Sequence, residues 1–245
     1  MSAWAFTPDA FHDALQREIV NTCKSQHVYA DAFIEDGDGT PVIGWRTDLF
    51  VAPDIVGSYE RRPFGIEIKT KDCMTFRRVS GWWETGIDAD KWDEYVALTD
   101  AGIPVTLVFL HRGRVSAVDR ASCADKGINV DRLTFGGLYV ASVHDLARLA
   151  PPREGTFQTN FGRSVSMVYW PIMSADGVRI GGGWTRYGLS SEPIVARQVP
   201  WWDVMGKCLR SIEGKDRTLP GRIGDAPLER RRVRMQEIDP RHLPW

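Results

Sequence analysis

The hydrophobic positions of this chain follow two different periods, and these periods predict helices and strands. Between Thr7 and Lys24, apolar residues recur at Phe11, Leu15 and Ile19, which is the spacing of one buried helix face. The later run IPVTLVFL is continuously apolar and of strand length, which is typical of a strand buried on both faces. The pattern predicts a helix over 7–24, strands over 27–34, 42–53 and 64–70, a helix over 90–99 and a strand over 103–110.

Beyond residue 110 the elements are shorter. The pattern predicts short strands over 114–118 and 138–143, a helix over 143–149, antiparallel strands within 153–200 and a short helix over 200–209. Pro151 and Pro152 suggest a boundary. We therefore expect a core over 1–150 and a β-rich extension with Trp and Gly over 151–245, ending in a tail that is rich in Gly, Pro and Arg.

Composition and charge exclude several classes of protein. The chain has 245 residues, 43% hydrophobic and 26% charged, which is ordinary for a globular protein. No apolar run approaches the roughly 20 residues of a membrane helix, and the N-terminus does not resemble a signal peptide. The four cysteines lie far apart without a CxxC pair, which argues against a zinc site and favours a reducing, cytoplasmic location. With a net charge of −1, the overall balance gives no support for nucleic-acid binding.

Charged residues within two of the predicted strands indicate a site. Asp48 opens the apolar run LFVAP, and the run FGIEIK carries Glu67 and Lys69 two positions apart. Because side chains alternate along a strand, Glu67 and Lys69 share one face, while Ile66 and Ile68 point into a core. Two carboxylates and an ammonium group at strand ends suit a divalent metal ion and the phosphate that it activates.

The order helix, three strands, helix, strand, together with RTDLFVAP, GIEIKTK and DKWDEYVAL, resembles the PD-(D/E)XK nuclease superfamily. The likeness is greatest to archaeal Holliday junction resolvases and small bacterial or phage-type repair nucleases, and it covers roughly residues 10–112. It implies an α/β fold with a restriction-endonuclease-like core (α-β-β-β-α-β), in which helices flank a mixed sheet.

The resemblance also implies roles for individual residues. Asp48 and Glu67, helped by the main-chain carbonyl of Ile68, would bind Mg²⁺ or Mn²⁺, and Lys69 would orient the attacking water. A following helix in the family often carries a Lys or Gln four residues before a Tyr, which Lys91 and Tyr95 match. The family glutamate on the first helix would correspond to Glu18.

The literal Pro-Asp pair of the superfamily name occurs at Pro53-Asp54 rather than at Asp48. A hairpin that places Pro53 opposite Phe64 brings Asp48 opposite Lys69. For Asp54 to reach Glu67, the hairpin must turn tightly at Glu60 and Arg61, with the less apolar run DIVGS as its strand. We favour Asp48, because the stronger strand pattern follows it.

Several basic residues are candidates for binding nucleic acid. Lys71, Arg77 and Arg78 follow the strand that carries Glu67, so they would contact phosphates or lie on a solvated surface. The run ERRRVR near the C-terminus suits a phosphate-binding arm, but terminal charge runs are more often only solvated.

We expect a metal-dependent nuclease that hydrolyses DNA phosphodiester bonds in DNA processing, repair or recombination. The alternative is a non-catalytic DNA-binding module that keeps the nuclease fold. A weaker one is a protein-interaction domain that works through the Trp-rich half. Cutting two strands in register usually takes two active sites, so a homodimer stays open, as do the DNA structure recognised and the endonuclease or exonuclease mode.

Overall fold

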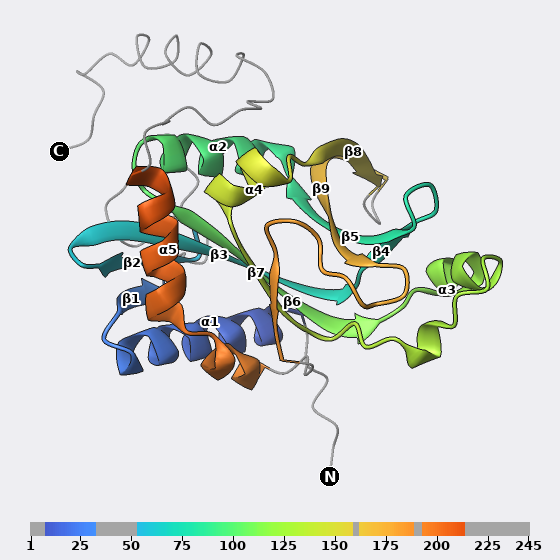
Figure 1. Ribbon diagram of the computed structural model, residues 1–245, viewed down its shortest axis with the longest axis horizontal. Helices are drawn as coiled ribbons and strands as arrows, with labels where there is room; N and C mark the ends of the chain where they lie inside the picture. The colour runs from blue at the N-terminus through green and yellow to red at the C-terminus, as the bar shows by residue number, and fades with distance from the viewer. Residues whose placement is uncertain (1–7, 33–52, 159–161, 189–192, 214–245) are drawn as a thin grey trace, which may run out of the picture.

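A computed structural model describes residues 8–32, 53–158, 162–188 and 193–213, and these contain two β-sheets and their covering helices (Figure 1). The first elements are α1 (Pro8–Ser25), β1 (Tyr29–Ala32), β2 (Ile55–Tyr59), β3 (Arg62–Cys73), β4 (Thr75–Arg77), β5 (Trp82–Asp88), α2 (Ala89–Asp100) and β6 (Val105–Arg114). The later ones are α3 (Ala117–Ala124), η1 (Val130–Arg132), β7 (Gly137–Ser142), α4 (Val143–Leu149), β8 (Arg153–Gln158), β9 (Ser164–Ser174), β10 (Thr185–Tyr187), η2 (Pro193–Gln198) and α5 (Trp201–Glu213).

The larger sheet is mixed and has six strands in the order β1-β2-β3-β6-β7-β10. Among the described strands, β3 and β6 form the one parallel pair, and α2 lies between them in the chain. The other neighbours in this sheet are antiparallel. The expected mixed sheet flanked by helices is therefore confirmed.

The two faces of this sheet bury separate cores. Ile66 and Ile68 of β3 pack with apolar residues of α1 and α5, including Leu15 and Trp201. On the opposite face, Phe109 of β6 packs with residues of α2, α4 and the smaller sheet. In Figure 1, α1 accordingly lies below the sheet, while α2 and α4 lie above it.

The β2–β3 hairpin differs from the favoured register. The structure pairs Phe64 with Gly57 and Tyr59 with Arg62, so the expectation that Pro53 faces Phe64 is wrong. The loop has two residues, Glu60 and Arg61, with φ of 50° and 64°. A right-handed strand twist favours such a primed turn, which requires positive φ at both loop residues.

Glu60 and Arg61 are poor choices for this turn, because a side chain in the left-handed region is strained by about 1–2 kcal/mol per residue. The double variant Glu60→Asn/Arg61→Gly is expected to raise the free energy of unfolding by about 1 kcal/mol, since Asn-Gly suits the same turn. Urea denaturation measures the change. Arg62→Gly, one residue later within β3, is the control and is expected to lower stability. A double variant no more stable than the parent would contradict the turn geometry.

The smaller sheet has four strands in the order β4-β5-β9-β8. Its hairpin β4–β5 lies between β3 and α2, where the sequence pattern predicted no strand. Strands β8 and β9 complete this sheet, while β10 joins the larger one by pairing with β7. Strands on both sides of Pro151 and Pro152 are thus hydrogen-bonded within the same two sheets.

Most predicted elements within the described ranges are present, with one correction. The strand expected over 114–118 is absent: β6 ends at Arg114 and α3 begins at Ala117, where the Ser116 side chain accepts a hydrogen bond from the Asp119 amide as an N-cap. The predicted strand over 42–53 and the basic tail lie outside the described residues, except Pro53, which precedes β2. None of the described helices has the length and hydrophobicity needed to span a membrane.

Candidate active site

The centre of the site is Glu67, a carboxylate buried in the middle of β3. Its side chain is only 1% exposed, and Lys69 Nζ lies 2.5 Å from its Oε1 atom. Lys91 Nζ approaches the same oxygen from α2 at 3.5 Å. Glu67 Oε2 has no hydrogen-bond partner in the part of the chain that the structure describes. A buried carboxylate oxygen without a hydrogen bond lowers the stability of the fold unless another group, such as a cation, binds it.

Asp54 lies at the edge of β3, just before β2 begins. Its Oδ2 atom accepts a hydrogen bond of 2.6 Å from the Ile68 main-chain N–H. The N–H and C=O groups of one strand residue point to the same side of the strand. The carbonyl of Ile68, the residue after Glu67, therefore faces the side of β3 on which Asp54 lies.

His12 of α1 completes the surroundings of Asp54, with Nε2 3.4 Å from Oδ2. The hydrogen bond with Asp54 raises the pKa of His12, against the opposing effect of burial. Burial opposes ionisation of Asp54, but His12, Lys69 and the Ile68 amide outweigh it, so the pKa of Asp54 lies below its usual range. Asp54 is therefore ionised at neutral pH.

Two further groups keep fixed protonation states. Burial disfavours the charged form of Lys69, but the charges of Glu67 and Asp54 more than offset it and raise the pKa of this lysine. Burial, together with the charge of Glu67, raises the pKa of the Tyr95 phenol. Lys69 is thus a cation and Tyr95 a neutral hydroxyl throughout the physiological pH range.

The structure brings Lys91 and Tyr95 to Glu67 because they lie one turn apart on the same face of α2. It does not bring Glu18 there. Glu18 pairs with Arg197 of η2, and six helical residues, about 9 Å of rise, separate it from His12. The structure therefore does not support Glu18 as a site residue. Two other α1 residues reach Asp54: His12 approaches its carboxylate, and the Gln16 side chain donates a hydrogen bond of 2.7 Å to its main-chain carbonyl. Asp48 lies outside the described residues.

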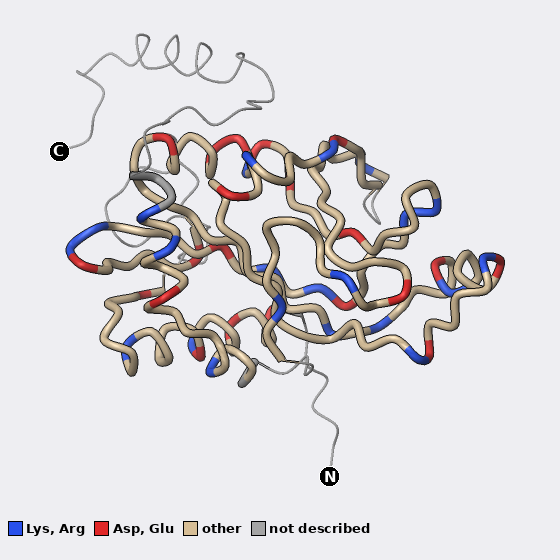
Figure 2. Tube along the Cα trace, in the orientation of Figure 1, with Lys and Arg blue, Asp and Glu red and all other residues tan. Residues whose placement is uncertain are grey.

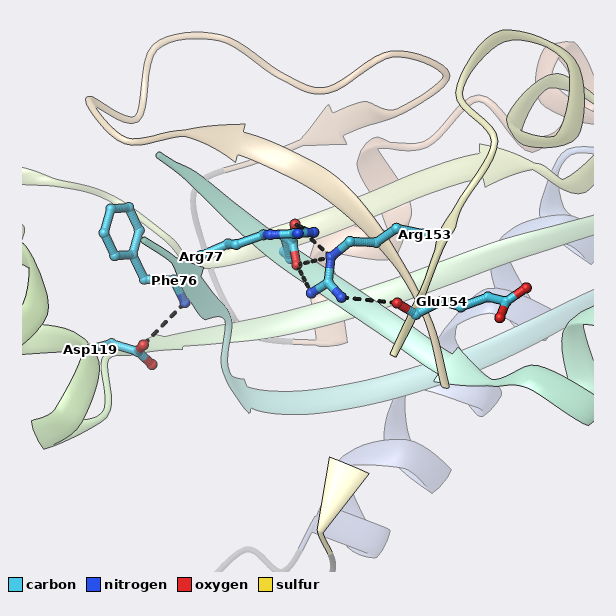
Figure 3. Close-up of polar contacts among 6 residues, drawn as sticks. Phe76, Arg77, Asp119, Arg153 and Glu154 are labelled. Carbon is cyan, nitrogen blue, oxygen red and sulfur yellow. Dashed lines mark hydrogen bonds and ion pairs between the residues drawn. The ribbon is translucent and has the colours of Figure 1, made fainter. Parts of the chain in front are cut away.

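Two of the three expected phosphate contacts are engaged elsewhere. Arg77 lies 3.6 Å from the buried carboxylate of Glu84, which also binds Arg153. Figure 3 shows the Arg77 and Arg153 side chains reaching toward one another. Arg78 donates to the Ser122 hydroxyl. Lys71 lies on the same face of β3 as Glu67 and Lys69, and its ammonium group donates to the Gly86 main-chain carbonyl.

Sequence patterns missed His12 and Asp88. A lone histidine on an amphipathic helix matches no motif. Asp88 directly precedes α2, where aspartate usually caps the helix, yet its side chain makes no capping hydrogen bond. Its charge acts instead on Lys71 and Tyr95. The missing cap interaction could be recognised only in three dimensions.

The residues fit a hard divalent cation of the magnesium type. Glu67 Oε2, the Asp54 carboxylate and the Ile68 carbonyl are all oxygen donors. Within the described ranges, no three His, Cys, Asp or Glu side chains form a metal-binding group. A bound ion would therefore rely on main-chain oxygen and water beside two carboxylates. Mg²⁺ typically keeps several waters and takes one or two carboxylates, so this donor set suits it.

Comparison with known proteins gives little beyond this geometry. No protein-family model matches the chain, and no curated protein matches it. A solved structure with some similarity is that of Hjc, a Holliday junction resolvase from the archaeal hyperthermophile Archaeoglobus fulgidus. It is 12% identical, the match covers 63% of this chain and 85% of the resolvase chain, and the TM-score is 0.31. An identity and a TM-score this low do not support a function for this chain, so only the geometry of the site can do so.

Proposed function

We propose that this chain is a metal-dependent nuclease that hydrolyses DNA phosphodiester bonds on a restriction-endonuclease-like core. The observation that carries the proposal is the buried Glu67 carboxylate, paired with Lys69 and Lys91 and adjacent to Asp54. Within the described residues, Glu67 Oε2 makes no hydrogen bond, and a second carboxylate lies close by, whereas a purely structural ion pair needs neither feature. Both features favour a site that binds a cation.

Asp54, Glu67 and the Ile68 carbonyl would hold Mg²⁺ or Mn²⁺. When bound, the ion would lower the pKa of a water molecule and stabilise negative charge on the transition state. Lys69, kept charged by its neighbours, would orient the attacking water and offset charge on the phosphate. Lys91 and the neutral Tyr95 hydroxyl would hold the Glu67 carboxylate in place.

DNA binding cannot rest on overall charge. Figure 2 shows Lys and Arg interspersed with Asp and Glu along the described trace, in keeping with the net charge of −1. Affinity would therefore come from lysines close to the site and from contacts of the substrate with the catalytic groups. Such binding is expected to weaken with added salt, since phosphate contacts release counterions.

The full chain should be incubated with a supercoiled plasmid, a linear duplex, a flap and a four-way junction, in Mg²⁺, Mn²⁺ or EDTA. We expect metal-dependent cleavage of at least one of these DNAs and none in EDTA. Gel-shift measurements on the same panel separate binding from cleavage. Binding without cleavage in either metal would overturn the proposal and favour the non-catalytic DNA-binding module.

A further inference from the structure

The face of β3 that carries Glu67 and Lys69 carries a third charged residue, Lys71. Alternate residues of a strand lie roughly 6.6 Å apart, so Lys71 is one repeat beyond Lys69 on the same side. Its ammonium group donates a hydrogen bond of 2.6 Å to the Gly86 carbonyl of β5. It also lies 5.6 Å from the centre of the Phe109 ring. Lys71 is thus held between the two sheets, beside the proposed active site.

The electrostatic surroundings of Lys71 differ from those of Lys69. The charged and titratable groups that act on it are Lys69 on its own strand and Asp88 at the end of β5, while His111 lies alongside it on β6. Burial and the Lys69 charge lower the pKa of Lys71 to about 8, although Asp88 acts in the opposite direction. Burial lowers the pKa of His111 to about 3, so this neighbour is neutral. Lys71 therefore gives up a proton more readily than an ordinary lysine does.

In phosphodiester hydrolysis, a group with this property can donate a proton to the leaving oxygen. The attacking water and the leaving oxygen lie on opposite sides of phosphorus, roughly in line. Lys69, paired with Glu67, lies at the end where the water would be activated. A residue one strand repeat further along the same face can reach the opposite end, where a sugar alkoxide leaves and needs a proton.

We propose that Lys71 is the general acid that protonates the leaving oxygen, an inference that rests on the proposed nuclease function. The water oxygen forms a bond to phosphorus while the bond from phosphorus to the leaving oxygen breaks. The leaving oxygen takes a proton from Lys71 Nζ. The attacking water releases a proton to solvent, from which Lys71 is reprotonated, so one water is consumed and a phosphomonoester and an alcohol are formed.

The decisive test compares two substrates at one mapped cleavage position. In one, the leaving atom is the natural oxygen; in the other it is sulfur, which needs no proton because thiols are far more acidic than alcohols. Two sulfur substrates are prepared, one for each bridging oxygen of that phosphate. One of them therefore carries sulfur at the position of the bond that breaks. Lys71→Gln is expected to slow cleavage of the oxygen substrate by about 10²–10⁴-fold, the usual contribution of a general acid. It should leave cleavage of the sulfur substrate near the wild-type rate.

Lys126 offers a matched control. Its ammonium group also donates to a main-chain carbonyl, that of Arg78, and lies 5.8 Å from the Phe76 ring centre. It is exposed, however, and lies in the turn after α3, beside the edge strand β4. Lys126→Gln should cleave both substrates normally. Lys71→Arg keeps the positive charge but cannot release a proton, so it should remain as slow as Lys71→Gln on the oxygen substrate.

The pH dependence gives a separate readout. Lys71 acts as an acid only while it is protonated, so wild-type cleavage of the oxygen substrate in Mg²⁺ should fall as pH rises above about 8. This fall should disappear with the sulfur substrate. NMR titration of the Lys71 side chain in metal-free protein should show the same midpoint without any reaction.

The outcomes separate the two proposals. Equal losses on the oxygen and sulfur substrates, full recovery in Lys71→Arg, or a Lys71 midpoint like that of an exposed lysine would overturn the role of Lys71 and leave the nuclease proposal intact. A wild-type chain that cleaves no DNA in either metal would overturn both.

Discussion

Replacing Glu67 by Gln is expected to reduce metal-dependent cleavage by at least about 10³-fold, equivalent to ~4 kcal/mol of transition-state stabilisation. The change keeps the shape of the side chain but removes the negative charge that faces Lys69 and Lys91. Without that charge the proposed cation loses its most buried ligand, and Lys69 loses the partner that positions it. Cleavage rates of the folded variant, checked by circular dichroism, measure the effect.

Glu84 provides a matched control for the loss of a buried carboxylate. It is 3% exposed, close to the value for Glu67, and it also pairs with two cations, Arg77 and Arg153. Glu84→Gln should lower stability, because two partly exposed arginines lose the buried carboxylate that they pair with, but cleavage per folded molecule should stay near wild type. Full metal-dependent cleavage by Glu67→Gln would remove the basis of the nuclease assignment.

Asp54→Asn is expected to weaken Mn²⁺ binding and to slow cleavage by about 10²-fold or more, because a neutral amide is a poor ligand for a hard cation. Asn is chosen because its oxygen can still accept the hydrogen bond from the Ile68 amide, so the edge of β3 is preserved. Calorimetric titration of Mn²⁺ measures the affinity directly, and cleavage assays measure the rate.

The same measurements on Asp48→Asn decide between the two aspartates. The proposed site requires the larger loss in Asp54→Asn. A larger loss of Mn²⁺ affinity in Asp48→Asn would assign the metal to the aspartate that the apolar pattern favoured. Equal, small losses in both would mean that neither aspartate holds the ion.

Local periodicity was sufficient for the elements that bury one regular face. The helical spacing of Phe11, Leu15 and Ile19 predicted α1, and the apolar run 103–110 predicted β6. Strand alternation alone placed Glu67 and Lys69 side by side, which the structure bears out at 2.5 Å. These features depend on neighbours within a few residues, so a single segment of sequence contains the information.

The strand that adjoins the site could not be chosen in this way. The run IVGSY contains Gly57 and half-buried positions, so it has a weak strand pattern. It nevertheless forms β2, in which Gly57 leaves room for the Phe64 ring and the Tyr29 carbonyl that a side chain there would meet. The Glu60-Arg61 turn that fixes its register lacks the Asn or Gly that usually marks such a turn. A shift of this register changes which aspartate adjoins Glu67.

The sequence by itself determined the main helices, the strand buried on both faces and the common face of Glu67 and Lys69. Only the tertiary structure decided that Asp54 and His12 meet at the edge of β3 and that β9 and β10 complete the two sheets. It also decided that Glu18 pairs with Arg197, and Arg77 with Glu84, away from the site. The physical reason is that strand pairing and ion pairing between distant segments depend on packing over the whole chain. A local pattern records only which face of each segment is buried.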